Sequence, residues 1–141
     1  MSRKKTRPLR LSLTLPDHTM KYELIDHTAD FGIRVFSADL QTLFADAAFA
    51  LYDVITELEL VEGLNDIDIC VSGDDLPDLM VNWLREVLYL WTGKQQLVKT
   101  VKILSLSEHG IRATVKTDTY DPERHIIKNE IKAVTYHQIQ V

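Results

Sequence analysis

Residues 39–55 read DLQTLFADAAFALYDVI, and this stretch decides the fold class because its apolar residues recur at helical spacing. Asp39 precedes the first apolar residue and is a typical N-cap. Residues 75–93, DLPDLMVNWLREVLYLWTG, repeat the pattern, with Asp75 as N-cap, Pro77 in the first turn and Gly93 as the stop. The two stretches predict two helices, each with one apolar face.

Around these helices the sequence is rich in short alternating or β-branched runs, which predict strands. The runs cover residues 21–25, 32–36, 66–71, 97–106, 110–117 and 131–141. Strands in runs, with two helices between them and no regular βαβ alternation, predict an α+β fold in which two helices pack on a mainly antiparallel sheet. Within it, Trp83 and Trp91 are expected in the core, and Cys70 is expected to be a small buried apolar residue.

The first 19 residues differ from the remainder. Five of the first ten are basic, and residues 9–15 then alternate leucine with polar residues, which fits either a short edge strand or a mobile arm. We therefore expect a flexible basic arm over residues 1–19 and a single domain over residues 20–141.

Charge and composition exclude several classes of protein. The 141 residues carry a net charge of −5, and without the first ten residues 11 basic residues face 21 acidic ones, a net −10. Such a body is no general nucleic-acid surface. A single cysteine excludes an internal disulfide, and no apolar run approaches the ~20 residues of a membrane span, so we expect a cytoplasmic protein.

The acidic residues are concentrated in one segment. Residues 53–78 hold nine carboxylates and no lysine or arginine. Such a run can steer a partner of opposite charge, but a solvated acidic loop is the commoner explanation and the one favoured here.

Residues 26–30, DHTAD, place two carboxylates, an imidazole and a hydroxyl in a predicted loop. Hard divalent cations such as Ca²⁺, Mg²⁺ or Mn²⁺ prefer oxygen ligands of this kind, so Asp30 is a candidate metal ligand and Asp26 a further one. The competing interpretation is a turn capped by Asp and Thr, with His27 bonded to backbone.

A second polar group follows later in the chain and includes Arg124, His125 and Lys132. Together with His27, these side chains are candidates to contact a phosphate or a partner, although a solvated loop is the default for such a segment. No motif of nucleotide binding or nucleophilic catalysis is present, so no catalytic residue is assigned.

Two motifs resemble one family. Residues 22–33, YELIDHTADFGI, are similar to the opening of the archease family, and residues 130–137, EIKAVTYH, are similar to its C-terminal signature. Residues 83–90 and 121–125 fit between them in the right order.

The resemblance implies an accessory protein, not an enzyme, for the GTP-dependent RNA ligase that joins tRNA halves in tRNA splicing and acts in RNA repair. It would promote guanylylation of the ligase and restore multiple turnover, and it would meet RNA only through the ligase. The family's metal site implies Asp30 as a ligand. Its other ligands, an Asp and the terminal residue of a last C-terminal strand, have no match here.

Two other functions stay open on the sequence. The same carboxylates would suit an independent metal-dependent hydrolase, and the basic arm would suit an RNA-binding adaptor.

Overall fold

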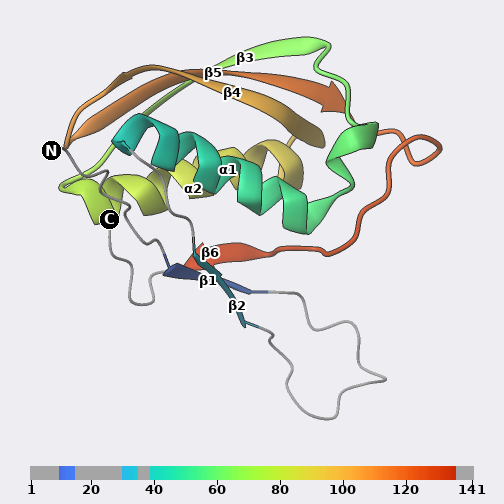
Figure 1. Cartoon of the computed structure of the whole chain (residues 1–141). Helices are drawn as coiled ribbons and strands as arrows, with labels where there is room; N and C mark the ends of the chain where they lie inside the picture. Colours follow the sequence, from blue (N-terminus) through green and yellow to red (C-terminus); the bar gives the residue numbers. More distant parts are fainter. Residues whose placement is uncertain (1–9, 15–29, 35–38, 136–141) are drawn as a thin grey trace, which may run out of the picture.

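The computed structural model describes residues 10–14, 30–34 and 39–135 (Figure 1). Two α-helices and six strands follow one another with a short 3₁₀ helix after the first α-helix. In chain order the elements are β1 (Arg10–Thr14), β2 (Asp30–Arg34), α1 (Leu40–Ile55), η2 (Leu58–Leu60), β3 (Asn65–Ser72), α2 (Leu76–Thr92), β4 (Gln96–Leu106), β5 (Gly110–Thr119) and β6 (Ala133–Thr135).

Both helices begin where local sequence signals predict, and α2 also ends where Gly93 predicts. The Asp39 carboxylate accepts a hydrogen bond from the backbone N–H of Thr42, and the Asp75 carboxylate accepts one from the backbone N–H of Asp78. Pro77 lies in the first turn of α2, where it has no intrahelical bond to lose, and Gly93 is the C-cap. These caps satisfy backbone groups that a helix end otherwise exposes.

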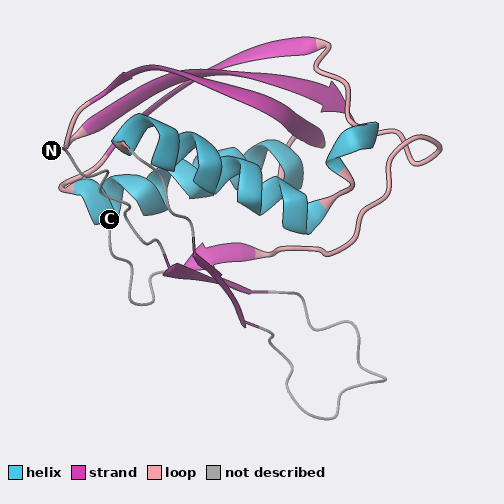
Figure 2. Cartoon of the chain, in the orientation of Figure 1, coloured by secondary structure: helices cyan, strands magenta, loops and turns pink. Residues whose placement is uncertain are grey.

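The strands form two separate three-stranded antiparallel sheets, with the orders β3-β5-β4 and β2-β1-β6. The two helices lie between these sheets (Figures 1 and 2). The predicted α+β class with antiparallel pairing is therefore confirmed.

The larger sheet has β5 in its centre, paired with β3 on one side and with β4 on the other. Along β5, Ile111, Ala113 and Val115 are buried against the helices, whereas Arg112 and Lys116 are exposed on the outer face. One face of this sheet is thus solvated, as antiparallel sheets allow.

The smaller sheet has β1 in its centre. Residues 10–14 pair with β2 on one side and with β6 on the other, so this strand is not an edge strand. Of the predicted C-terminal strand the structure describes β6 alone, and residues 136–141 lie outside the described residues, as does the strand predicted over residues 21–25.

The core forms where the helices meet each other and the large sheet. Trp83 is fully buried and its Nε1–H donates to the carbonyl oxygen of Phe44 (2.9 Å), while Trp91 is partly buried against the same core. Tyr52 is also fully buried, and its hydroxyl donates to the carbonyl oxygen of Val87 (2.6 Å), which ties α1 to α2. Burial raises the pKa of Tyr52.

The prediction that Cys70 is buried is wrong. The thiol is exposed, because Ile69 is the residue of this part of β3 that faces the core and side chains alternate along a strand. The alternation of residues 66–71 is consistent with this exposure, because Cys70 lies on the same face of the strand as Asp66 and Asp68.

Candidate functional site

Asp30 is the one member of the DHTAD motif that the structure describes, and it is the first residue of β2. Its Cα partner in the sheet is Thr14, which lies opposite Ala133 at the start of β6. Since β2 and β6 both run antiparallel to β1, their first residues lie at the same end of the sheet, two strand spacings or about 10 Å apart. The exposed Lys132, next to Ala133, belongs to the same end.

The remaining candidates of this motif, Asp26 and His27, lie outside the described residues. Among the side chains that the structure does describe, no three His, Cys, Asp or Glu residues gather closely enough to hold a metal ion. The metal site at Asp30 and Asp26 therefore stays a prediction. Carboxylate oxygens such as theirs are the donors that Ca²⁺, Mg²⁺ and Mn²⁺ prefer, so the chemistry of the two residues fits such an ion.

A second set of polar side chains converges on Asp118, which lies near the end of β5 and is 2% exposed. Its carboxylate accepts four hydrogen bonds. The donors are the backbone N–H of Glu62 (2.9 Å), Nη1 and Nη2 of Arg124 (3.2 and 3.1 Å) and Nε2 of His125 (3.0 Å). Asp118 thus joins β5 to the segment after η2 and to the loop after β5.

These contacts hold Asp118 ionised. Burial by itself raises the pKa of its carboxyl, but the hydrogen bonds from Arg124, Glu62 and His125 outweigh burial and lower the pKa to about 2. The same bidentate contact, chiefly through its hydrogen bonds, raises the pKa of Arg124.

Arg124 contacts three carboxylates. Besides Asp118, it lies 3.6 Å from the carboxylate of Glu62 and 3.4 Å from that of Asp121. The guanidinium of Arg124 therefore forms ion pairs within the protein, and these ion pairs fix the loop at residues 120–125.

His125 is 4% exposed, so the default interpretation of this segment as a solvated loop is wrong for this residue. Its Nδ1 accepts a hydrogen bond from the backbone N–H of Asp121 (2.9 Å), which leaves Nε2 to carry the proton donated to Asp118. The ring also stacks on Tyr120, whose ring in turn meets Trp91 edge-on. His125 therefore acts as a buried link between the loop and the core.

Two residues of this network, Asp118 and Glu62, are absent from the candidates found by sequence. Asp118 follows the buried Thr117 in β5, where strict alternation predicts exposure. Glu62 contributes a backbone N–H, which no sequence pattern marks. The signal that was available is the nearby motif DPERH, which contains both side-chain donors to Asp118.

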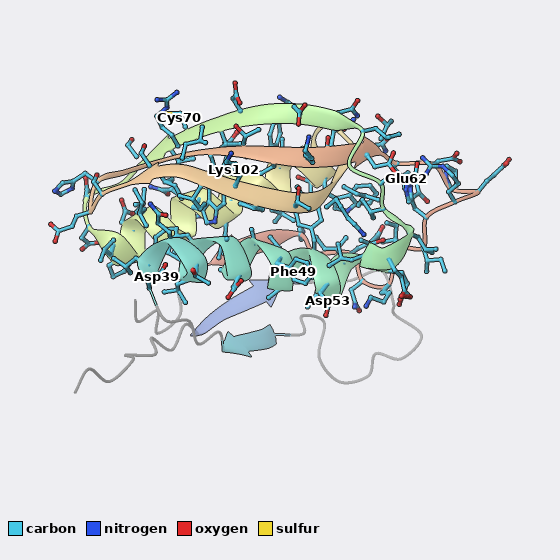
Figure 3. The ribbon with its side chains drawn as sticks, turned by 45° about the horizontal axis from the view of Figure 1, so that its top comes forward. Asp39, Phe49, Asp53, Glu62, Cys70 and Lys102 are labelled. Atoms are coloured by element: carbon cyan, nitrogen blue, oxygen red, sulfur yellow. The ribbon has the colours of Figure 1, made fainter. Side chains whose placement is uncertain are left out.

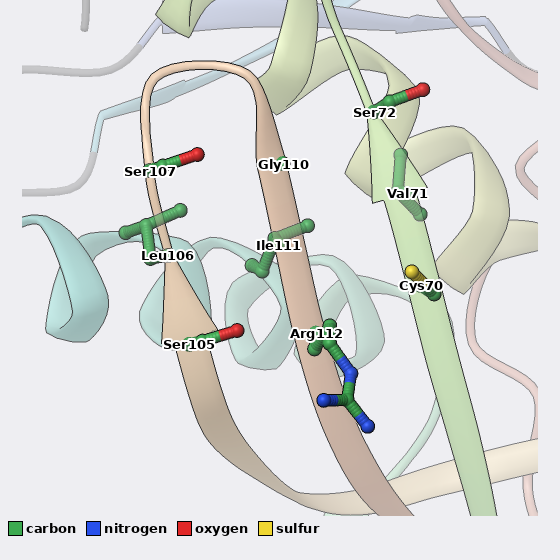
Figure 4. A pocket seen from close by; sticks show the side chains of 9 residues that line it. All are labelled: Cys70, Val71, Ser72, Ser105, Leu106, Ser107, Gly110, Ile111 and Arg112. Carbon is green, nitrogen blue, oxygen red and sulfur yellow. The ribbon is translucent and has the colours of Figure 1, made fainter.

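The hollows on the described surface include two of similar size. One, of about 440 Å³, lies beside the Asp118 network and is lined in part by Leu64, Tyr120 and Pro122. The other, of about 400 Å³, lies near the β4–β5 turn and is lined in part by Cys70, whose sheet neighbour is Arg112 (Figure 4). Of the residues singled out by sequence, Arg124 lines the first hollow.

None of the helices described by the structure is long and apolar enough to cross a membrane.

Comparison with known proteins gives a consistent result. A model of the Archease protein family matches residues 22–141. Similar proteins include the protein archease of Methanopyrus kandleri, 37% identical over 125 residues, which cover 86% of this chain and 89% of that protein. Those of Pyrococcus furiosus (36% over 124 residues, covering 86% and 87%) and Methanosarcina acetivorans (33% over 131 residues, covering 90% of each) are also similar.

Proposed function

The chain belongs to the archease family, and from that premise we propose that it is an accessory protein that activates a GTP-dependent RNA ligase acting in tRNA splicing and RNA repair. The observation that carries the proposal is the extent of the match. The family match spans residues 22–141, which include both the DHTAD motif and the EIKAVTYH motif. In this role the chain contacts RNA indirectly, through the ligase that binds it.

In this role the chain is not the catalyst. It promotes guanylylation of the ligase histidine and restores multiple turnover, so its effect is read out on the ligase. Asp30, with Asp26, would hold a divalent cation, which when bound would offset negative charge on phosphate groups. Asp30 would hold that charge at the end of the small sheet where β2 and β6 begin.

The Asp118 network supports this role indirectly. Asp118, Arg124 and His125 fix the loop that follows β5, and this loop leads through residues 126–132 into β6. Lys132 directly precedes β6 at the same sheet end as Asp30. The network is therefore a positioning element for the neighbourhood of the proposed site.

The test is guanylylation of the purified ligase by labelled GTP, with and without this chain. We expect stimulation by the wild-type chain and a loss of most of it in Asp30→Ala. The matched control is Asp53→Ala, which removes another carboxylate from an exposed position on α1 (Figure 3) and is expected to stimulate like wild type.

Circular dichroism and thermal unfolding establish that the two variants are equally folded. Equal stimulation by Asp30→Ala and wild type would refute the metal role of Asp30. No stimulation by the wild-type chain would refute the accessory role itself.

A further inference from the structure

One end of the molecule, which we call the acidic end, consists of residues 57–64 and 120–126. It carries three of the large apolar side chains that are exposed in the described structure: Leu60 at 39%, Leu64 at 68% and Ile126 at 54%. Exposed apolar residues scattered singly need no explanation, but three on adjoining segments mark a contact surface.

The two segments of the acidic end are bonded to each other. The backbone N–H of Glu57 donates to the carbonyl oxygen of Ile126 (3.4 Å), and the Thr56 hydroxyl donates to the same oxygen (2.6 Å). The Glu62 backbone N–H donates to Asp118 (2.9 Å), which also holds His125. The surface is therefore formed before any partner binds, and binding to it costs little ordering entropy.

The hollow of about 440 Å³ beside Asp118 borders this surface at Leu64. Leu64, Tyr120 and Pro122 contribute to its apolar lining, and Asn65, Asp121 and Arg124 contribute polar groups. A shallow apolar hollow with a few polar groups suits a side chain of a partner protein.

The charge around this hollow is mainly negative. The acidic end holds five carboxylates, and Arg124 is the one Lys or Arg within it. Two lysines reach it from outside: Lys128 Nζ lies 3.5 Å from the Glu57 carboxylate, and Lys99 Nζ donates to the carbonyl oxygen of Leu58. Asp118 matches the charge of Arg124, and Glu57 that of Lys128, so the other carboxylates, among them Glu62 (Figure 3), give this surface its negative potential. The five are Glu57, Glu59, Glu62, Asp121 and Glu123.

We propose that the acidic end docks on a basic surface of the GTP-dependent RNA ligase; this rests on the function proposed above. An enzyme that binds RNA carries basic surface for the phosphates, and such a surface complements these carboxylates. RNA itself is repelled by them. A second copy presenting the same end is repelled as well, because the same charges would face one another.

The experiment measures the dissociation constant of the ligase and this chain by calorimetry at two salt concentrations. The test variant is Glu59→Lys with Glu123→Lys, two exposed side chains of the acidic end. The control is Glu86→Lys with Glu108→Lys, which makes the same change in net charge on α2 and at the β4–β5 turn. We expect the test variant to bind at least about tenfold more weakly, with a reduced salt dependence, and the control to change about twofold or less.

A second pair tests the apolar part. Leu64→Ser is expected to weaken binding, whereas Leu104→Ser, at a residue 48% exposed on the large sheet, is expected to leave it unchanged. Equal losses in test and control variants, or no loss in either test variant, would overturn the proposed surface while stimulation by the wild-type chain remains. If the wild-type chain neither binds nor stimulates the ligase, the proposed function fails together with this surface.

Discussion

Replacing Asp118 by asparagine is expected to destabilise the protein by about 3 kcal/mol. The lowering of its pKa from 3.8 to about 2 corresponds to about 2 kcal/mol in favour of the ionised side chain. Asparagine has no charge, and its NH₂ group would face donors of Arg124, His125 or Glu62, which adds about 1–3 kcal/mol. The two contributions sum to about 3–5 kcal/mol, and the partial exposure of Arg124 places the expected loss at the lower end of this range.

The assay is urea unfolding followed by circular dichroism, with Asp66→Asn as the matched control. Asp66 also forms an ion pair, with Lys116 at 2.8 Å, but both side chains are more than half exposed. An exposed pair of this kind contributes about 0–1 kcal/mol. If Asp118→Asn and Asp66→Asn lower the free energy of unfolding equally, the Asp118 network is not the structural centre described here.

Three further predictions concern stability. The folded pKa of Asp118 lies below its unfolded value, so its stabilising contribution is present above about pH 4 and is lost as the pH falls towards 2. In urea titrations at several pH values, the free energy of unfolding of the wild type should therefore fall more steeply in this window than that of Asp118→Asn. Tyr52→Phe should cost about 1 kcal/mol in urea unfolding, since it removes the hydroxyl that donates to the buried carbonyl of Val87, and an unchanged midpoint would contradict this bond. Gly73→Ala should lower the thermal midpoint, because a Cβ there would lie 2.6 Å from the backbone nitrogen of Leu79, whereas Gly110→Ala, with nothing nearer than 3.7 Å, should not; equal midpoints would contradict the close approach.

The helices were predictable because their signals are local. The apolar periodicity, the caps at Asp39 and Asp75 and the stop at Gly93 all lie within or next to the helix that they define. The strands at β3, β4 and β5 were predictable for the same reason.

Pairing was not predictable, because the partners of a strand are far away in the sequence. The alternation at residues 9–15 is compatible with a strand, but nothing in it indicates that β1 lies between β2 and β6, or that the strands form two sheets.

For the site, the sequence identified Arg124 and His125 as candidates but not the buried carboxylate that binds them. Whether a polar side chain in a loop is solvated or buried depends on which segments close over it. Here the segment at residues 57–62 and the end of β5 enclose His125, and that arrangement exists only in the folded protein.

The accessory role is tested most directly by the number of joining events per ligase molecule. The measurement follows joining of tRNA halves by the GTP-dependent ligase, with the RNA substrate in large excess and with or without this chain. We predict that product stops near one joining event per ligase without the chain and continues through many events with it. The same product yield with and without the chain would contradict the proposal.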